Sequence, residues 1–162
     1  MDISIISTGG TFNKIYNPIK GELEIDKDSK AIEEILKKWN MKAKIINIIH
    51  KDSLFMNESD REELLKEVKT LPQKNIIIVH GTDTMDISAK KLALANLDKR
   101  VIFTGAMVPF SIDKVEATAN LVSAITFCNS PYQKGVYIAM HSLIAPYNKI
   151  IKNREKGIFE LI

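Results

Sequence analysis

Five short apolar runs, rich in β-branched residues, constrain the fold of this 162-residue chain more than any other feature. Each run is nearly continuous rather than alternating, which is typical of strands buried on both faces of a parallel sheet. The runs are Ile3–Ile6, Ile45–Ile49, Ile76–Val79, Val101–Phe103 and Val136–Ala139. Because helical patterns lie between them and parallel crossovers are right-handed, we expect an α/β fold in three layers. This is a doubly wound, mainly parallel sheet of the flavodoxin-like or Rossmann-like kind, flanked by helices.

Apolar residues on common helix faces mark the segments between the runs. A Ser59-x-x-Glu62 pattern predicts a capping box for the second of these helices, and the third is expected to begin near Asp83. The apolar sets are Ile32, Ile35, Leu36 and Trp39; Leu64, Leu65, Val68 and Leu71; Ala89, Leu92 and Ala93; and Leu121, Val122, Ile125 and Cys128.

The segment Phe12–Ile25 interrupts the alternation of strands and helices. Pro18 and Gly21 lie there in a polar, turn-rich setting, which indicates a hairpin or a mobile loop. Since few of its residues can reach a core, we expect residues Asn13–Glu24 to be mobile without ligand and to order over a bound one.

Composition narrows the class of protein. Hydrophobic residues make up 45% of the chain and charged residues of mixed sign 27%, which fits one globular domain over residues 1–162. The net charge is only +3 and no Lys/Arg block is interleaved with aromatic residues, so nucleic acid is not expected as a partner. No apolar stretch reaches the roughly 20 residues that span a bilayer, so no membrane partner is expected either.

The cysteine and histidine content bears on compartment and cofactors. A single cysteine, Cys128, suits a reducing compartment, and no signal-peptide pattern opens the chain, so we expect a cytoplasmic protein. The histidines His50, His80 and His141 are not spaced as a zinc site and no cysteine joins them. We therefore expect neither a metal nor a cofactor.

Small, hydroxyl-bearing and glycine residues follow four of the five predicted strands. In open α/β sheets, ligands bind beyond the carboxyl ends of the strands, so these segments should meet at one edge, with Thr11, Ser53, Thr82 and Ala106 converging there. Glycines let backbone amides approach a ligand and polarise a carbonyl. The segments are Ser7–Thr11, Lys51–Ser53, His80–Thr84 and Thr104–Met107.

Each motif has a simpler structural interpretation when it is taken alone. Thr8–Thr11 fits a tight turn, and Gly81–Asp83 fits a helix N-cap, since threonine and aspartate both accept hydrogen bonds from first-turn amides. Ser53 alone is an ordinary loop serine and Lys152 an ordinary surface lysine.

Taken together, the motifs resemble a known family. Thr8–Thr11 and His80–Met85 resemble, in order and separation, the two signature sequences of the L-asparaginase family, and Thr104–Pro109 resembles a third block. The resemblance reaches about Phe159 and is strongest to short, single-domain bacterial members. It implies the larger N-terminal domain of the usual two-domain enzyme, with the C-terminal domain expected to be absent.

The resemblance implies catalytic roles for five residues. Thr11 matches the threonine that attacks the amide carbon and forms an acyl-enzyme, which water then hydrolyses to acid and ammonia. Tyr16 matches the loop tyrosine that completes this first group. Thr82, Asp83 and Lys152 match a second group, in which a desolvated lysine beside the aspartate moves protons through the threonine.

The resemblance also implies a substrate-binding set. Asp83 would hold the α-ammonium group of the substrate and Ser53 its α-carboxylate. The Ala106 carbonyl, with backbone amides near Thr11 and Thr82, would orient the scissile amide and stabilise its oxyanion, and Gly10 also belongs to the binding set. The chain departs from the family pattern at Val108, where the family has arginine, and at His141-Ser142, where it has Asn-Asp.

The expected activity is hydrolysis of the side-chain amide of L-asparagine or a related small amide. Two alternatives remain open: a glutaminase-like amidase acting on a larger carrier, as related domains do in tRNA-dependent amidotransferases, and a non-catalytic amino-acid-binding domain. We also expect a homodimer or homotetramer, because a single domain leaves the site half open. The apolar tail Gly157–Ile162 would lie in the interface or, equally, cover the chain's own core.

Overall fold

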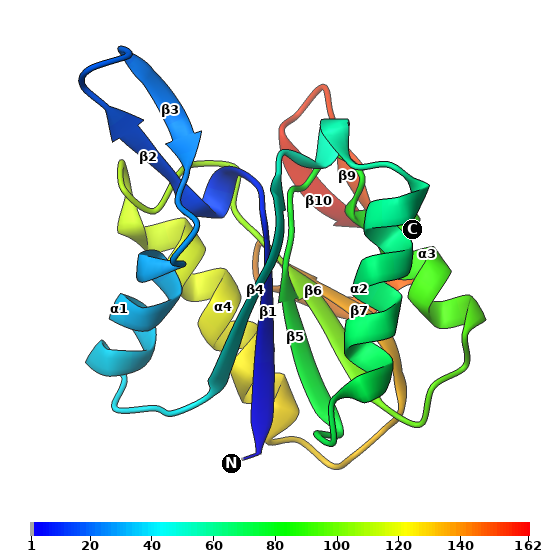
Figure 1. The fold of residues 1–162 in the computed structure, drawn as a ribbon. Helices are drawn as coiled ribbons and strands as arrows, with labels where there is room; N and C mark the ends of the chain where they lie inside the picture. The colour runs from blue at the N-terminus through cyan, green and yellow to red at the C-terminus, as the bar shows by residue number, and fades with distance from the viewer. Residues whose placement is uncertain (1) are drawn as a thin grey trace.

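A computed structural model describes residues 2–162 as a mixed sheet between two layers of helices (Figure 1). The sheet has six strands in the order β4-β1-β5-β6-β7-β8. All neighbouring pairs are parallel except β7 and β8, which are antiparallel. This confirms the predicted α/β class and the mainly parallel sheet. The strands are β1 (Ile3–Gly9), β4 (Lys44–Lys51), β5 (Asn75–Val79), β6 (Arg100–Thr104), β7 (Gly135–Met140) and β8 (Leu143–Pro146).

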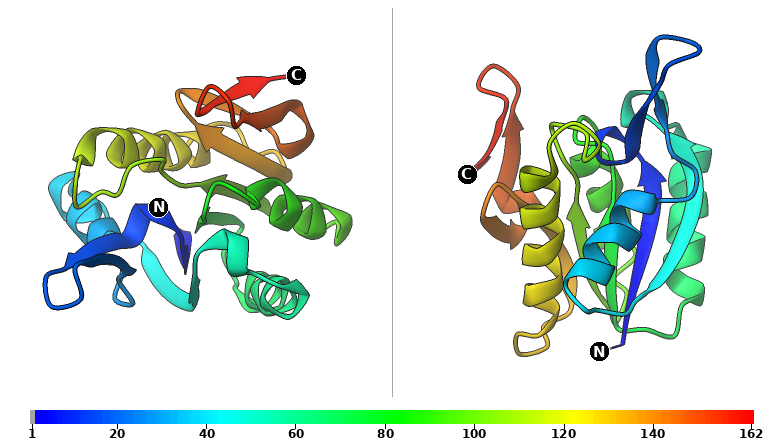
Figure 2. Two further views of the ribbon diagram at one scale, coloured as in Figure 1. Left: turned by 90° about the horizontal axis from the view of Figure 1, so that it is seen from above. Right: turned by 90° about the vertical axis from the view of Figure 1, so that its left-hand side faces the viewer.

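The helices cover the two faces of the sheet in pairs. Helices α1 (Lys30–Lys38) and α4 (Lys114–Cys128) pack on one face, and α2 (Glu58–Thr70) and α3 (Met85–Leu94) pack on the other. The view along the strands in Figure 2 shows these layers. The chain therefore forms the three-layer, doubly wound arrangement that its β-branched runs predict.

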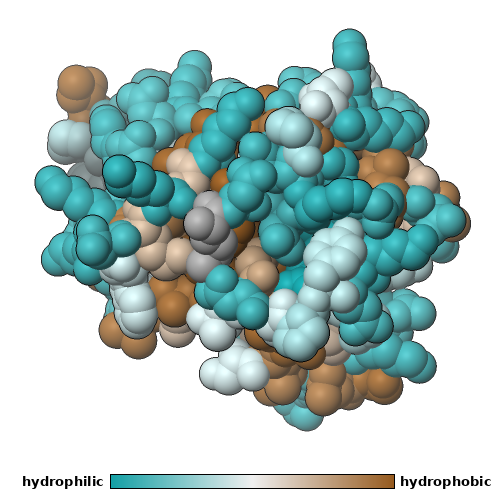
Figure 3. All heavy atoms as spheres, turned by 90° about the horizontal axis from the view of Figure 1, so that it is seen from below, coloured by the Kyte–Doolittle hydropathy of each residue, from teal (hydrophilic) through white to brown (hydrophobic). Residues whose placement is uncertain are grey.

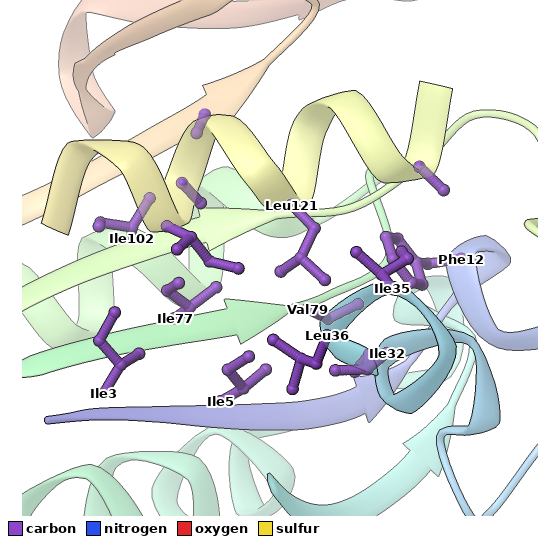
Figure 4. Close-up of a cluster of buried hydrophobic side chains, with 14 of the residues drawn as sticks. Ile3, Ile5, Phe12, Ile32, Ile35, Leu36, Ile77, Val79, Ile102 and Leu121 are labelled. Atoms are coloured by element: carbon purple, nitrogen blue, oxygen red, sulfur yellow. The ribbon is translucent and has the colours of Figure 1, made fainter. Parts of the chain in front are cut away.

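Two hydrophobic clusters, one on each face, hold the layers together. Ile5 and Ile77 of the sheet pack with Ile35 of α1 and Leu121 of α4 in the first cluster (Figure 4). Leu64 of α2 belongs to the second cluster, with strand residues that point to the opposite face. Successive residues of a strand point to opposite faces, so continuous apolar runs supply both clusters.

Two small hairpins and three short 3-10 helices complete the fold. Strands β2 (Lys14–Asn17) and β3 (Glu22–Ile25) pair antiparallel and project beyond the sheet, so the predicted hairpin is confirmed (Figure 1). Strands β9 (Ile150–Asn153) and β10 (Ile158–Leu161) form the second hairpin. The 3-10 helices are η1 (Thr11–Asn13), η2 (Ser53–Phe55) and η3 (Tyr147–Lys149).

Three local predictions were wrong. The capping box of α2 is formed by Asn57 and Asp60, each two positions before its predicted counterpart, Ser59 and Glu62. Trp39 is 54% exposed, because α1 ends at Lys38 before that side chain can turn to the core. The run Ile45–Ile49 is only partly buried, because β4 lies at an edge of the sheet rather than inside it.

The surface at the amino-terminal ends of the strands is mainly hydrophilic, with separate apolar groups near its rim (Figure 3). Within residues 2–162, no helix combines the length and apolar character required to cross a membrane.

Arg100 is the largest fully buried side chain, and it joins β6 to the end of α4. Its guanidinium donates to the carbonyls of Phe127, Ser130 and Pro131, the last at 2.6 Å, and lies over the Phe127 ring at 5.0 Å from the centroid. Carbonyls at a helix C-terminus carry partial negative charge and lack helical partners, so a buried cation suits them.

We expect Arg100→Met to lower the free energy of unfolding by about 3 kcal/mol, because several buried carbonyls lose their donor at once. For a domain of this size the melting temperature should fall by roughly 6 to 12 °C. Calorimetry measures this, with the exposed Lys90→Met on α3 as control. A fall no larger than that of the control would show that Arg100 does not hold α4.

Candidate active site

The site lies where the direction of the sheet connections changes. The chain leaves β1, forms β4 on one side of it, and then crosses to β5 on the other side. Ligands in doubly wound sheets bind outside the carboxyl ends of the strands at such a point. Thr11 follows β1 and Thr82 follows β5, so the two threonines flank this point at the same edge of the sheet.

Three loops touch at this edge. A Cβ atom at Gly10, which has φ of 77°, would lie 2.5 Å from the Gly81 amide nitrogen. A Cβ atom at Gly81 would lie 2.6 Å from the Ser53 hydroxyl oxygen. Glycine is therefore required at both positions. It lets the backbones of the loops after β1 and β5 touch, and it leaves room for the Ser53 side chain of the loop after β4.

Ser53 lies inside this contact rather than in an open binding position. Its side chain is 1% exposed, and its hydroxyl accepts from the Thr84 amide at 3.4 Å. The Thr84 hydroxyl in turn donates to the Ser53 carbonyl at 2.9 Å. The structure thus brings Ser53 to the predicted edge but gives it a role in joining two loops.

Thr11 is held by the residue that follows it. Phe12 is completely buried in the cluster between the sheet and helices α1 and α4 (Figure 4). Its ring stacks on Phe110 with centroids 6.5 Å apart, and the Phe110 amide donates to the Phe12 carbonyl. Thr11, by contrast, is partly exposed. The chain therefore fixes the backbone at Thr11 while leaving its side chain accessible.

Lys152 joins Thr82 and Asp83 from a distant part of the chain. Its ammonium nitrogen lies 2.8 Å from the Thr82 hydroxyl oxygen and 2.9 Å from Asp83 Oδ1. The Lys152 side chain is only 13% exposed, and Thr82 is 7% exposed. The Thr82 hydroxyl is also within 3.4 Å of Met107 Sδ. These three residues form one hydrogen-bonded group, as expected from the sequence.

Arg154 is a member of this group that sequence reasoning missed. Its Nη1 lies 2.6 Å from Asp83 Oδ1, and its Nη2 donates to the Asp83 backbone carbonyl at 2.7 Å. Arg154 follows Lys152 by two residues at the end of β9, and residues two apart in a strand point to the same face. This spacing is the one feature of the sequence that could have placed Arg154 beside Lys152.

The loop after β6 is fixed by side chains from α4. Glu116 accepts from the amides of Met107 and Val108 at 2.8 and 3.0 Å, and Asn120 donates to the Gly105 carbonyl at 3.0 Å. Ala106 lies between these bonds and is 1% exposed. Glu116 and Asn120 are four residues apart on one helix face, a spacing that could have identified them as partners of this loop.

His141 connects the same helix to the second hairpin. His141 and Ser142 have positive φ angles of 51° and 64° and form the two-residue turn between β7 and β8. The His141 ring lies 3.1 Å from Glu116 and accepts from the Phe159 amide of β10 at 3.1 Å. His141 thus contacts both the carboxylate that holds the β6 loop and the backbone of β10.

His80 supports the Gly81 loop from inside the sheet. Its Nδ1 lies 2.7 Å from the Gly81 carbonyl and its Nε2 lies 2.8 Å from the Ser88 hydroxyl. Because a carbonyl only accepts, Nδ1 carries the proton and Nε2 accepts from Ser88. Complete burial lowers the pKa of His80 from 6.5 to about 4, so the ring is neutral at physiological pH.

Of the predicted catalytic residues, Thr82, Asp83 and Lys152 share hydrogen bonds, whereas within residues 2–162 no hydrogen bond joins Thr11 or Tyr16 to them. Tyr16 is the more exposed of these two. It lies on β2 and is 62% exposed.

The base of the hairpin that carries Tyr16 is fixed by two contacts of Lys14. The Lys14 ammonium nitrogen lies 2.9 Å from Asp52 Oδ2, and the Lys14 backbone carbonyl accepts from the Ser111 hydroxyl at 2.7 Å. Beyond that base the hairpin projects into solvent (Figure 2).

Comparisons with known proteins agree with this geometry. Residues 2–158 match the family model described as asparaginase, N-terminal. A subunit of the glutamyl-tRNA(Gln) amidotransferase of Methanococcus maripaludis strain C7 is 33% identical over 146 residues, which cover 86% of this chain and 35% of that protein. An L-asparaginase of Thermococcus kodakarensis is 26% identical over 164 residues, which cover 98% of this chain and 49% of that protein.

Solved structures show the same fold. The thermostable L-asparaginase of Thermococcus kodakarensis superposes with a TM-score of 0.87 at 24% identity, over 100% of this chain and 51% of that one. A probable cytoplasmic L-asparaginase of Campylobacter jejuni gives a TM-score of 0.83 at 26% identity, over 99% of this chain and 52% of that one. The chain thus spans about a third to a half of the length of these relatives.

We expect Gly10→Ala to disrupt the edge of the sheet where the loops meet, because its Cβ atom would collide with the Gly81 backbone. Gly21→Ala is the matched control, since Gly21 also has positive φ, of 70°, but no atom lies within 4 Å of its Cβ position. Both variants carry the strain of a positive φ, and Gly10 adds that of ψ −179°, a conformation that essentially only glycine adopts. Calorimetry should show that Gly10→Ala alone lowers the free energy of unfolding by a further amount of about 1 to 3 kcal/mol. Equal losses would mean that the loops do not touch.

We expect burial of neutral His80 to make stability fall in mild acid. The unfolded chain binds a proton near pH 6.5 but the folded chain only near pH 4, so the stabilisation is present above 6.5 and is lost as pH falls toward 4. Between about pH 7 and pH 5 the loss should be about 2 kcal/mol. Urea unfolding at both pH values measures it, with His80→Gln as a non-titrating reference. The same loss in both proteins would exclude His80 as its source.

Proposed function

Given that the chain belongs to the asparaginase family, as the match of residues 2–158 shows, we propose that it is an amidohydrolase. In this proposal it hydrolyses the side-chain amide of L-asparagine or a related small amide to a carboxylic acid and ammonia. The family resemblance expected from the Thr8–Thr11 and His80–Met85 motifs is thereby confirmed, whereas the substrate and the residue roles remain part of the proposal.

The observation that carries the proposal is the hydrogen-bonded group of Lys152, Thr82 and Asp83. Lysine is rarely buried, and here its side chain is 13% exposed with a hydroxyl and a carboxylate as partners. A hydroxyl between a lysine and an approaching amide can pass a proton in either direction. A binding domain without turnover needs no such arrangement.

We assign the nucleophile to Thr11. Its hydroxyl oxygen attacks the amide carbon, while its proton passes through the group of Thr82 and Lys152 to the leaving nitrogen. The carbon–nitrogen bond breaks, ammonia leaves, and an acyl ester remains on Thr11. Water then attacks this ester, giving the free acid and restoring the hydroxyl.

The backbone at the meeting point of the loops would supply the electrostatic stabilisation. Amides near Gly10 and Thr82 belong to loops in direct contact, so they need little reorganisation when charge develops on the amide oxygen. The Ala106 carbonyl, held by the bonds of Gly105 and Met107 to α4, would accept from the amide nitrogen of the substrate. Asp83 and Tyr16 complete the proposed set.

A second candidate is amide hydrolysis that serves a larger carrier. It is favoured by the 33% identity to the amidotransferase protein of Methanococcus maripaludis, which is higher than the identity to the L-asparaginases reported above. This chain matches only 35% of that protein, so its carrier and partners belong to the proposal.

Assembly and compartment are further parts of the proposal. On the tail, Phe159 is buried in the chain's own core, whereas Ile158, Leu161 and Ile162 are 41, 59 and 70% exposed. One residue of the tail therefore packs in the chain's own core and three remain exposed for an interface, and we propose a homodimer or homotetramer.

We place the reaction in the cytoplasm because Cys128 is a free, buried thiol.

We expect Thr11→Ala, Thr82→Ala and Lys152→Met each to reduce kcat/KM by about a thousandfold or more, because members of one catalytic unit do not act independently. Ammonia release from L-asparagine, L-glutamine and asparaginyl dipeptides measures the loss. Thr70→Ala, an exposed threonine at the end of α2, is the matched control.

Two outcomes would contradict this assignment. Parental rates in Thr11→Ala on the best substrate would mean that another group is the nucleophile. No ammonia from any of these amides, together with tight amino-acid binding in calorimetry, would instead establish a binding domain.

A further inference from the structure

Arg61 of α2 is a buried cation without a carboxylate partner among residues 2–162. The residue is 6% exposed, and its guanidinium donates to the Met56 carbonyl and to the Thr84 hydroxyl, both at 3.1 Å. Its Nε donor has no partner among these residues. Arginine stays charged at every physiological pH, and a buried charge is costly unless an opposite charge compensates it. This position therefore holds a positive charge that the described side chains do not neutralise.

Carboxylates beside this arginine are paired with lysines instead. Both carboxylate oxygens of Asp60 accept from Lys51, at 2.7 and 2.9 Å. Glu58 and Glu62 pair with Lys91, and their own side chains are 71 and 61% exposed, so water screens their charges. The charge of the arginine is therefore left to act on a ligand at the adjoining edge of the sheet.

Two hydrogen bonds separate Arg61 from the loop after β4. The Thr84 hydroxyl accepts from Arg61 and donates to the Ser53 carbonyl at 2.9 Å. Helix α2 begins at Glu58, so its first turn lies at the carboxyl-end edge of the sheet, where the site is (Figure 1). Ser53 is 1% exposed, so the charge acts across protein rather than water, where electrostatic interactions are stronger. A ligand at the predicted carboxylate position beside Ser53 would therefore lie in a positive potential.

The same charge acts on a second group of this edge. Burial is the largest cause of the lowered pKa of His80, about 4, and the charge of Arg61 acts in the same direction. The His80 ring binds the Gly81 carbonyl at 2.7 Å, so the potential of Arg61 extends to the loop after β5 as well. An anion beside these two loops would gain from this potential, whereas a neutral group would not.

We propose that Arg61 determines the specificity of the site, because its buried charge favours amides whose α-substituent beside these loops is a carboxylate. Arg61 is a positioning residue rather than a catalytic one, since Thr84 and Ser53 lie between it and the ligand. This inference rests on the proposed amidohydrolase function and deepens it, because it assigns a residue to the choice of substrate.

L-Asparagine and L-asparaginamide test this charge, because they differ only in an α-carboxylate against an α-carboxamide. Arg61→Gln should lower kcat/KM for L-asparagine by about tenfold, through a higher KM, and that for L-asparaginamide by less than about twofold. Arg61→Lys keeps the charge, so the ratio of the two values should stay within about threefold of the parental ratio. Lys66→Met is the control, since it removes an exposed positive charge from the same helix. Chromatography of the two products, L-aspartate and L-isoasparagine, measures both rates.

Two additions keep the test decisive. Arg61→Met is a second neutral variant, so that one unfolded protein, recognised by its melting curve, does not end the comparison. Calorimetric binding of L-aspartate and L-isoasparagine, which differ in the same α-group, needs no turnover.

A parental preference for the carboxylate form that is lost in the neutral variants and kept in Arg61→Lys supports the inference. An unchanged ratio in the neutral variants, equal losses for both forms, a lost preference in Arg61→Lys, the same shift in Lys66→Met, or no binding of either product overturns it. Failure of the amidohydrolase proposal is a separate result: a preference for L-aspartate that depends on Arg61, without hydrolysis of any amide.

Discussion

Direct contact between the backbones of two loops is the constraint on which the rest of the site depends. Gly10 and Gly81 approach so closely that neither loop has room for a side chain at the contact. Parallel strands with a change of winding between them bring the loops to one edge, but only glycine lets them touch. The positions of Thr11 and Thr82 follow, because each threonine is the next residue in its loop.

Polar side chains hold this contact from three directions. His80 binds the Gly81 carbonyl from within the sheet, Ser53 joins the Thr84 segment, and Glu116 holds the loop after β6. Each bond satisfies a backbone group that would otherwise be buried without a partner, which costs about 1 to 3 kcal/mol. The loops are therefore rigid on the side of the core, while the β2–β3 hairpin projects into solvent on the other side.

The sequence predicts the strands and helices of this molecule better than the contacts between side chains that lie far apart in the chain. Continuous β-branched runs can be satisfied only by buried strands, and the motifs after them then share one edge. Periodicity does not reveal which side chains face each other across 71 residues, so the pairing of Arg154 with Asp83 was missed. The capping box of α2 was misplaced because Asn57 and Asp60 overlap with an equally good pattern at Ser59 and Glu62.

Lys152 lies on a hairpin that is separate from the six-stranded sheet. The hairpin is attached through the Ile150 and Phe159 side chains in the core and the bond of the Phe159 amide to His141. The side chains of Lys152 and Arg154 add bonds to the loop after β5. Small units with few attachments open at a lower free energy than the whole domain. Detachment of β9 and β10 alone would withdraw the lysine while the sheet and its four helices stayed folded. The temperature range in which the protein can work would then be set by this hairpin rather than by its core.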